Sequence, residues 1–495
     1  MPANRDKFVR YDAVIIGSGV SGLTAAITLA QRGRKVAVVE KSKQICPLIR
    51  RFKRGNVWCD PAFHYTGGFE DSGALSVLFR YLGMRDMIHA VPMKDDAYDL
   101  LHFGHRQIPL PTGFDALRDT LCSHFPKSRQ AIHKYIESVK ALMVSTPFIS
   151  YDMEFGDFTR LQNDSQSLTD YLQSAGAEEE LQQLLGQYGE FLYGVAGHEV
   201  PFPVHAITMG TFYKSPHTLA HGGDDIVDAF ETRLEQEGVD LFCGQAVTGL
   251  KVANERRLQG VEIDGDAFLE TENCIYTAHP GLLSHILPRG SVKPAYISRL
   301  KDLENTFSTF ALYLEVDEIP ERIANTNMYK LLPGENELKS DSILAIMSCD
   351  PAHHDGRKKA LCVLKGAGNL PFGEEAYRNR KKSGAYYDYK ARETEKAVRQ
   401  LEDFFPEIKG KFKVVDSATP YTYERYTGTP GGSMYGVKHS VNQIGLNPVT
   451  SIVGFYLAGQ SILMPGVMGA AISGFLGASK IIGLEKLWKE VQKCR

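Results

Sequence analysis

The first forty residues show a regular succession of apolar runs and one helical pattern. An apolar run at 11–16 is followed by a glycine-rich turn, by apolar positions with helical spacing at 23–31, and by a second apolar run at 35–40. Short apolar runs between glycines are typical of strands covered on both faces, whereas the middle segment has the period of a helix. The pattern predicts a strand, a helix and a parallel strand, which together form one βαβ unit.

The rest of the chain alternates between helical and strand-like patterns without an internal repeat. Apolar residues with helical spacing predict helices over 132–143, 226–234 and 386–405. Short apolar runs predict strands at 247–252, 258–263, 310–316, 343–347 and 361–364. We therefore expect an α/β fold, in which a discontinuous Rossmann-like nucleotide-binding domain is interleaved with a mixed α+β domain.

The C-terminal part contains a long stretch without charged residues. No Asp, Glu, Lys or Arg occurs between 439 and 479, but prolines, asparagines and glycines interrupt the apolar residues. A transmembrane helix needs about 20 consecutive apolar residues, which this stretch lacks. We predict a buried strand near 454–459 and a buried helix that begins after Pro465, not a membrane span.

Composition and charge limit the class of protein. The chain has 495 residues, 43% of them hydrophobic and 23% charged, which is typical of a globular protein of two to four domains. A formal net charge of −3 gives no basic field for binding nucleic acid. The eight cysteines include no C-x-x-C pair, and the N-terminus lacks the apolar segment of a secretory signal. We expect a cytoplasmic protein that binds no metal and no nucleic acid.

The turn of the βαβ unit carries the strongest chemical motif. It consists of Gly17, Ser18, Gly19, Val20, Ser21 and Gly22, and the second strand ends at Glu40, followed by Lys41. The first glycine permits the tight turn, the second lets backbone N–H groups approach a pyrophosphate, and the third permits close packing of the helix on the sheet. A carboxylate 23 positions after Gly17 suits the adenosine ribose hydroxyls. This combination predicts an adenine dinucleotide.

A second glycine-rich element favours a flavin over a nicotinamide. After the buried strand at 454–459, a proline-glycine turn opens into a helix of small residues that starts with Gly466, Val467, Met468 and Gly469. The N-terminus of such a helix can approach a flat ring, and its dipole would stabilise negative charge on a reduced flavin. We expect the hydrogen of Gly469 to face that ring.

With both ends in view, the chain resembles the FAD-dependent phytoene desaturase-type oxidoreductases, which include carotenoid isomerases and retinol saturases. Three blocks, at about 11–70, 220–280 and 415–482, carry the resemblance. It implies an FAD-binding domain at 1–75, 205–290 and 425–495, and a substrate-binding domain at 76–204 and 291–424. No histidine or cysteine stands in an attachment motif, so we expect non-covalent FAD.

The resemblance also implies contacts at single positions. Val247 matches the residue whose backbone meets the adenine, and Gly459 with Gln460 would lie along the ribityl-pyrophosphate. Two positions depart from the family pattern. The family usually has two glycines where this chain has Cys46 and Pro47, and an acid where it has Gln460. Because proline has no N–H, the contact to the cofactor at this place must differ from that in the family.

His64 is the candidate for proton transfer, because it precedes the Gly67–Gly68 pair near which the family places the flavin. A histidine that only shapes the loop is the alternative interpretation. Tyr65, Glu424 and Arg425 are weaker candidates.

The expected reaction is hydride transfer between the flavin and a carbon–carbon bond of an apolar polyene, isoprenoid or acyl chain. Desaturation, saturation and isomerisation stay open, as does the electron partner, which is a quinone, oxygen or another carrier. An amine- or protoporphyrinogen-oxidase-like enzyme and a flavoprotein without turnover are the alternatives. The apolar stripe at 481–491, with lysines beside it, would suit a peripheral contact with a membrane surface.

Overall fold

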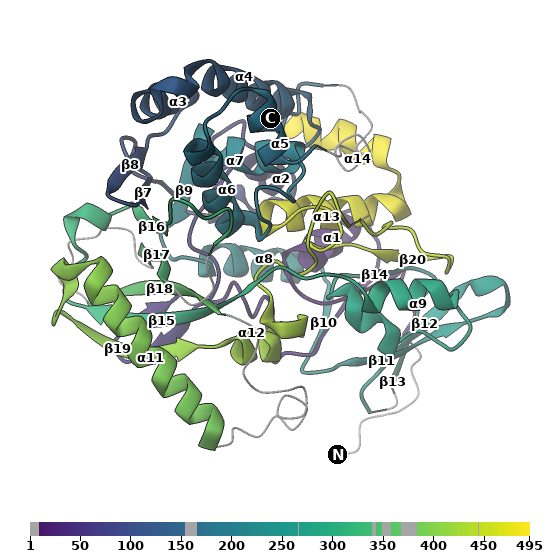
Figure 1. Ribbon diagram of the computed structural model, residues 1–495. Helices are drawn as coiled ribbons and strands as arrows, with labels where there is room; N and C mark the ends of the chain where they lie inside the picture. Colours follow the sequence, from purple (N-terminus) through teal and green to yellow (C-terminus); the bar gives the residue numbers. More distant parts are fainter. Residues whose placement is uncertain are drawn as a thin grey trace.

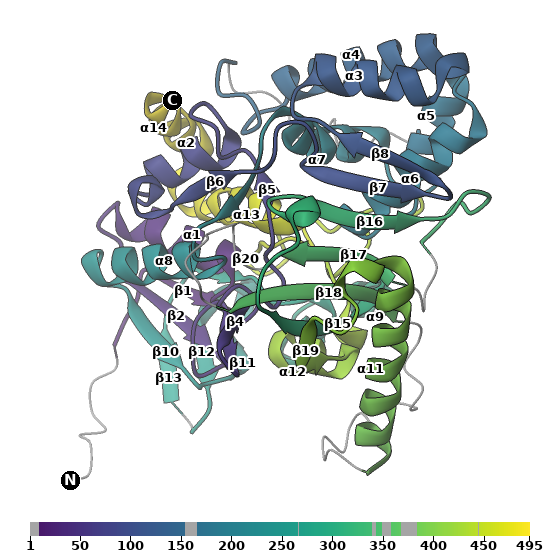
Figure 2. The ribbon, with the colours of Figure 1, turned by 90° about the vertical axis from the view of Figure 1, so that its left-hand side faces the viewer.

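The structure is a computed structural model that describes residues 9–153, 166–265, 267–338, 343–348, 358–367, 384–443 and 445–495. Two large sheets organise the molecule (Figures 1 and 2). A parallel sheet with α1 and α13 lies on one side, and a larger mixed sheet lies beside it. Helices α3 to α7 cover the mixed sheet at the top of both views.

The parallel sheet has five strands drawn from three separate stretches of the chain. Their order is β10 (Asp240–Cys243), β2 (Val36–Glu40), β1 (Ala13–Ile16), β14 (Cys274–Tyr276) and β20 (Phe455–Leu457). Every pairing is parallel, and Ile16 lies opposite Val39 on one side and Tyr276 on the other. This arrangement confirms the expected Rossmann-like fold, and it explains why its strands are almost entirely apolar.

Alternation along β1 shows how this sheet is covered. Ala13 and Ile15 face the helices α1 (Val20–Ala30) and α13 (Gly466–Ile482). Val14 and Ile16 face the opposite core, which the antiparallel sheet of β11 (Val247–Val252), β12 (Leu258–Ile263) and β13 (Ala267–Glu270) completes. Because neighbouring side chains of a strand point to opposite faces, one short apolar run supplies both cores.

The mixed sheet has seven strands. Their order is β19 (Phe412–Ala418), β15 (Ser308–Val316), β18 (Lys359–Ala367), β17 (Ile343–Ser348), β16 (Asn327–Leu331), β7 (Asp99–Phe103) and β8 (Arg106–Leu110). Strand β15 pairs with β18 over its whole length, from Ser308 opposite Ala367 to Val316 opposite Lys359. The pair β7–β16 is parallel and joins segments more than two hundred residues apart.

The two faces of the mixed sheet have different covers. Phe310, Leu312 and Leu314 of β15 pack against α11 (Gly384–Phe404), which crosses the sheet in Figure 2. Ala311 and Tyr313 belong to the core on the other face. The helices on that side are α3 (Phe114–His124), α4 (Arg129–Ser145), α5 (Leu168–Ser174), α6 (Glu179–Tyr193) and α7 (Phe202–Lys214).

Smaller elements complete the structure around the two large sheets. They are the hairpin β3 (Phe52–Arg54)–β4 (Val57–Cys59), the sheet of β5 (Thr66–Gly67), β9 (Pro216–Leu219) and β6 (Ala90–Pro92), and the helices α2 (Ala74–Tyr81), α8 (Asp224–Gln236), α9 (Pro294–Lys301), α12 (Pro420–Thr427) and α14 (Leu484–Val491). The small sheet matters for the site, because the segment between β4 and β5 runs past the cavity described below.

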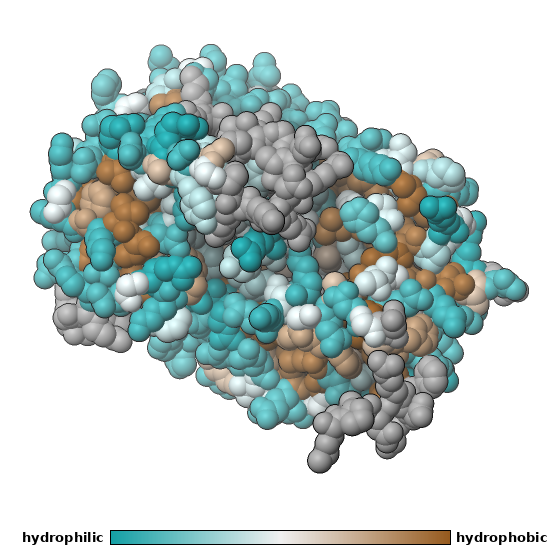
Figure 3. Space-filling model, turned by 90° about the horizontal axis from the view of Figure 1, so that it is seen from below, coloured by the Kyte–Doolittle hydropathy of each residue, from teal (hydrophilic) through white to brown (hydrophobic). Residues whose placement is uncertain are grey.

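The apolar side of α14 is covered by the chain itself. Leu487, Trp488 and Val491 are buried, and Trp488 stacks on Tyr151 with ring centroids 5.6 Å apart. These residues of the apolar stripe, which suggested a membrane contact, therefore pack inside the protein. Among the described residues, no helix is long and apolar enough to cross a membrane. Seen from below, apolar residues form separate patches in a mostly hydrophilic surface (Figure 3).

Candidate functional site: a cavity between the two sheets

A cavity of about 540 Å³ lies between the parallel sheet and the mixed sheet. On one side it is lined by the residues that follow the parallel strands, among them Gly17 after β1 and Lys41 after β2. Ligands of open α/β sheets bind at this carboxyl edge. On the other side it is lined by Phe212 of α7, Thr309 of β15 and Leu364 of β18. The cavity thus joins a nucleotide-type site to the second domain.

The three glycines of the first turn have the geometry that the motif requires. Gly17 has a φ of +100°, which favours glycine. A Cβ on Gly22 would overlap the carbonyl oxygen of Gly17, so the third glycine permits the close packing of α1 on β1. A Cβ on Gly19 would meet nothing within 4 Å, because this position faces open space. The turn therefore leaves room for a group directly at the start of α1.

The N-terminus of α1 offers unused donors to that space. Gly19 is the N-cap and provides no side chain to satisfy the first N–H groups of the helix. Ser18, Val20 and Ser21 line the cavity with it, and the buried hydroxyl of Ser21 has no hydrogen-bond partner. Free N–H groups, a hydroxyl donor and the positive end of the helix dipole form a site for an anion such as a pyrophosphate.

Glu40 is held at the edge of the cavity by its neighbours. Its Oε2 accepts hydrogen bonds from the backbone N–H and the hydroxyl of Ser18, at 2.9 and 2.8 Å. Its Oε1 accepts from the N–H of Ser42 at 2.7 Å. A carboxylate has about four lone-pair sites, so at least one remains for a ligand hydroxyl. Glu40 thus stabilises the glycine turn and is also a candidate ligand for a ribose hydroxyl.

The cavity wall beside Glu40 contains two residues that were predicted from the sequence and a third that was not. Lys41 and Val247 both line the cavity. Gln245 lies beside them: its N–H donates to the carbonyl of Glu40 at 3.0 Å, and its side-chain oxygen is buried without a partner. An unpaired acceptor next to Val247 fits an adenine amino group. No sequence motif marks Gln245, because its role comes from the pairing of β10 with β2.

Cys46 shows how this chain accommodates its departure from the usual glycine pair. Its φ is +46°, in the left-handed region that favours glycine. Its N–H and its thiol both bond to the carbonyl oxygen of Ser18, each at 3.1 Å. Burial, with a smaller contribution from nearby Glu40, raises the pKa of this thiol well above its ordinary value. Cys46 is therefore a protonated structural residue, and Pro47 beside it lines the cavity.

The C-terminal turn completes the nucleotide side. Gly459 has a φ of +121° and donates its N–H to the hydroxyl of Ser473. Gln460 lines the cavity with its neighbour, and its backbone carbonyl accepts a hydrogen bond from His439 at 2.8 Å. Gly466, Val467 and Met468, at the start of α13, line the same cavity. The structure thus brings the first and last glycine-rich elements together around one space.

Gly469 is placed differently from our expectation. It does not line the cavity, because its hydrogen faces the chain: a Cβ here would overlap the carbonyl oxygen of Met464. The small residue permits a tight turn into α13.

Gly469→Val is therefore expected to lower the melting temperature by several degrees, because the added side chain displaces the Met464 turn. Thermal unfolding followed by circular dichroism measures this. Gly466→Ala, at a position with free space but with a φ of +83°, should cost less. A Gly469→Val protein as stable as wild type would contradict the packing role.

The half of the cavity toward the mixed sheet is apolar and aromatic. It is lined by Phe63, Phe191, Leu192, Phe212, Met347, Leu364, Tyr423, Met434 and Tyr435. Among the described residues that line the cavity, Glu40 is the only acid and Lys41 the only lysine or arginine, and both lie at the nucleotide end. The second half therefore offers apolar contact and no carboxylate to pair with a cation. Phe191 of α6 is among these lining residues.

His64 lines the cavity. Its Nδ1 is buried without a hydrogen-bond partner, while its backbone carbonyl accepts from the hydroxyl of Thr218 at 2.9 Å. Burial lowers the pKa of the imidazole to about 4. At neutral pH the ring is therefore uncharged, and it can accept or donate one hydrogen bond but holds no extra proton. Of the weaker candidates, Tyr65 lines the cavity, whereas Glu424 and Arg425 do not.

Tyr65 connects the cavity wall to a buried polar network that the sequence did not predict. Its hydroxyl donates to Asp99 Oδ2 at 2.6 Å and lies 2.7 Å from the hydroxyl of Tyr329. Tyr188 donates to the same carboxylate oxygen at 2.5 Å, and Asn327 donates to the other at 2.9 Å. Burial raises the pKa of Asp99 to about 7, although these three hydrogen bonds act in the opposite direction. The network fixes the Tyr65 ring against the cavity.

The donor set of the cavity fits a flavin dinucleotide. The open space at Gly19, the unpaired hydroxyl of Ser21 and the unpaired acceptor of Gln245 are groups that a pyrophosphate and an adenine would satisfy. The Nδ1 of His64, in the wall of the same cavity, is also buried without a partner. Buried polar groups without partners are rare in native proteins, so several along one cavity indicate a bound polar ligand.

Comparison with known proteins agrees with this geometry. Residues 20–482 match the family model described as flavin containing amine oxidoreductase. All-trans-retinol 13,14-reductases from Macaca fascicularis and Homo sapiens are each 25% identical, over 96% of this chain and 86% of theirs. A prolycopene isomerase from an Oncidium hybrid cultivar is 29% identical over 25% of this chain and 21% of its own. The resemblance inferred from the sequence is thereby confirmed.

Solved structures share the fold. Putrescine oxidase bound to putrescine superposes with a TM-score of 0.66 at 14% identity, over 96% of this chain and all of that one. An oxidoreductase from Methanosarcina mazei gives a TM-score of 0.64 at 16% identity, over 94% of this chain and 99% of that one. These likenesses confirm the expected fold class of an interrupted Rossmann-like domain with an inserted second domain.

Proposed function

The chain belongs to the flavin-containing amine oxidoreductase family. We propose that it uses its FAD to reduce, form or isomerise a carbon–carbon double bond in an apolar polyene, isoprenoid or acyl chain. FAD as the cofactor and oxidoreductase activity agree with the expectations from the sequence. Relatives that align along nearly the whole chain are retinol reductases, and a partial match is a prolycopene isomerase. Their substrates are polyenes.

The observation that carries the proposal is the chemistry of the cavity wall. An amine substrate is a cation, and burying it needs a nearby carboxylate or a set of strong acceptors. The described wall has its only acid, Glu40, at the nucleotide end, and its other half consists of aromatic, aliphatic and hydroxyl side chains. Apolar burial contributes about 25 cal/mol per Å², so a polyene needs no ionic anchor. The wall therefore favours a lipid over an amine.

We assign the FAD contacts to the predicted residues that line the cavity. The start of α1 with Ser21 would hold the pyrophosphate, Glu40 a ribose hydroxyl, and Gln245 with Val247 the adenine. Gln460 and the segment from Gly466 to Met468 would lie along the remainder of the cofactor. Gly22 and Gly469 do not line the cavity, but their lack of a side chain permits the tight turns at the starts of α1 and α13.

The bound flavin supplies hydride transfer, and the chain supplies position, exclusion of water and proton transfer. Phe212, Leu364 and Met347 would restrict an extended alkene to a narrow apolar space. His64 is neutral at pH 7, so its role is to accept or donate one hydrogen bond at its unpaired Nδ1. Tyr65 is held in a fixed orientation by Asp99.

The test is a comparison of substrates with the purified holoenzyme. The flavin is reduced photochemically under anaerobic conditions, and all-trans polyene alcohols or carotenoids in liposomes are offered beside soluble diamines and monoamines. We expect reoxidation of the flavin, or double-bond migration without net redox change, with the polyenes alone. Oxidised flavin is offered the same compounds, so that desaturation and amine oxidation are both visible. Turnover confined to amines would overturn the assignment.

The same holoenzyme preparation serves to identify the electron partner and to test for binding to a membrane. Quinones and oxygen are added separately to the reduced enzyme, and the faster oxidant identifies the class of carrier. Flotation with liposomes shows whether the enzyme binds a membrane surface, for which α14 offers little apolar area because its stripe is buried.

FAD should be bound without a covalent link. The Cys46 thiol bonds to the Ser18 carbonyl, and its raised pKa leaves it a poor nucleophile. Precipitation of the purified protein with acid is expected to release yellow FAD into the supernatant, identified by mass spectrometry. Flavin that stays with the pellet would indicate an attachment.

A further inference from the structure

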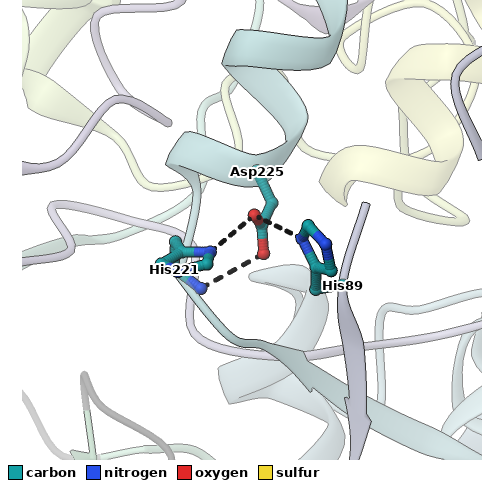
Figure 4. A group of neighbouring side chains, drawn as sticks. All are labelled: His89, His221 and Asp225. Atoms are coloured by element: carbon teal, nitrogen blue, oxygen red, sulfur yellow. Dashed lines mark hydrogen bonds and ion pairs between the residues drawn. The ribbon is translucent and has the colours of Figure 1, made fainter. Parts of the chain in front are cut away.

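Three donor side chains from separate elements meet at a point outside the cavity (Figure 4). His89 directly precedes β6, His221 follows β9, and Asp225 lies in the first turn of α8. The pairing of β6 with β9 places the two histidines side by side, because the N–H of Ala220 donates to the carbonyl of His89 at 2.9 Å. The sequence predicted no metal site, since no local motif joins these residues and His89 is more than 130 positions from the other two.

The donor atoms converge on a single carboxylate oxygen. Nδ1 of His221 lies 2.9 Å from Asp225 Oδ1, and Nδ1 of His89 lies 3.3 Å from the same atom. All three donor atoms lie within 4.8 Å of one another. The other oxygen of Asp225 accepts the backbone N–H of His221 at 3.1 Å, which fixes the carboxylate. Figure 4 shows both imidazole rings turned toward it.

We propose that His89, His221 and Asp225 bind a divalent transition-metal ion of the zinc type. Such an ion takes imidazole nitrogen and carboxylate oxygen at about 2.0–2.1 Å in a tetrahedron, whose edges are then about 3.3 Å. The two edges to Asp225 Oδ1, 2.9 and 3.3 Å, are close to that length, and the two nitrogens lie within 4.8 Å of each other, so rotations of the side chains would place three ligands around one ion. Two nitrogen donors and one oxygen donor favour zinc, cobalt or nickel over magnesium or calcium.

Exposure and charge are compatible with an ion that enters from solvent. The histidine side chains are 64% and 61% exposed, whereas Asp225 is 6% exposed. Water can therefore reach the ion and complete its coordination. The start of α8 carries a partial positive charge, which opposes a cation, but the Asp225 carboxylate offsets it. The neighbouring Asp224 is neutralised by Arg51, at 3.1 Å, and contributes little.

The position of the site indicates a structural role. The turn between His221 and α8 packs on segments that line the FAD cavity: Gly223 donates its N–H to Asp60 at 3.0 Å, and a Cβ on Gly223 would overlap the carbonyl oxygen of Ile49. An ion held by His89 and His221 would clamp this turn to the small sheet. We expect it to stabilise the protein, and this inference does not depend on the proposed substrate.

The test uses the FAD-loaded protein without an affinity tag, stripped of metal by a chelator. Titration calorimetry with zinc chloride is expected to show one site with a dissociation constant in the micromolar range. His221→Gln and His89→Gln should each weaken it by at least about tenfold, because each removes one of three protein ligands. His105→Gln, an exposed histidine in the β7–β8 turn, is the matched control and should bind like wild type.

Two further measurements distinguish zinc bound at this site from zinc bound elsewhere on the protein. Bound cobalt should give weak visible bands of nitrogen and oxygen ligation, without the strong near-ultraviolet band of a thiolate. Zinc should raise the melting temperature of wild type and of His105→Gln but not of His89→Gln. The alternative is that both histidines only donate hydrogen bonds to Asp225. Absence of stoichiometric binding, equal binding by all variants, or a thiolate band would overturn the proposal.

Discussion

Glu40→Ala is expected to weaken FAD binding by about 100-fold or more, and Glu40→Gln by about tenfold. The carboxylate braces the glycine turn through Ser18 and Ser42, and in our assignment it also holds a ribose hydroxyl. A hydrogen bond to a charged group contributes about 1.5–3 kcal/mol, and about 1.4 kcal/mol corresponds to a tenfold change in affinity. Alanine loses the brace and the ribose contact together, whereas glutamine keeps one acceptor oxygen.

The measurement is a fluorescence titration of the apoprotein with FAD. Glu235→Ala, which removes an exposed carboxylate from α8, is the matched control and should bind FAD like wild type. Circular dichroism of each variant separates loss of the cofactor from loss of the fold. If both Glu40 variants bind FAD as tightly as the control, Glu40 is not a cofactor ligand.

Asp99→Asn is expected to remove a pH dependence of stability between about pH 4 and pH 7. Burial raises the pKa of Asp99 from 3.8 to about 7 in the folded protein, so folding favours the neutral carboxyl group. The resulting stabilisation is fully present below pH 3.8 and is lost as the pH rises through 7. A shift of about three units corresponds to about 4 kcal/mol. Asparagine stays neutral throughout, so the variant should gain stability relative to wild type as the pH rises.

Melting temperatures of the two holoproteins at several pH values between 4.5 and 8 give this difference. Other titrating groups are common to both proteins and cancel. The tyrosines around Asp99 do not titrate in this range, because burial raises the pKa of Tyr65, Tyr188 and Tyr329 well above 10. Asp95→Asn, an exposed neighbour, should follow wild type. Parallel curves for Asp99→Asn and wild type would show that Asp99 is ionised in the folded state over the whole range.

The parts of the site that were predictable are encoded in short segments. The unit of β1, α1 and β2 needs only 28 residues, from Ala13 to Glu40, and each glycine of the turn has a separate steric reason. The strands at 247–252 and 258–263 have the predicted bounds. In such segments the local pattern and the tertiary packing favour the same structure.

The rest depended on contacts between distant segments. The Asp99 network draws on residues 65, 99, 188, 327 and 329, and none of them is marked by a local motif. The orientation of Gly469 was wrong in our expectation, because the helix start is set by the path of the chain from Met464. Periodicity locates a helix, but its rotation about its own axis follows from packing against other elements.

The order of strands in the parallel sheet has a consequence for biosynthesis. Strand β1, at residue 13, pairs with β14, which in turn pairs with β20 at residue 455, and α13 then packs on α1. During translation the first strand and its glycine turn leave the ribosome long before the elements that complete the cavity. Contacts this distant in sequence form late and slowly. We therefore expect FAD to bind only once synthesis is nearly complete, and until then the apolar strands of the emerging chain are exposed to aggregation.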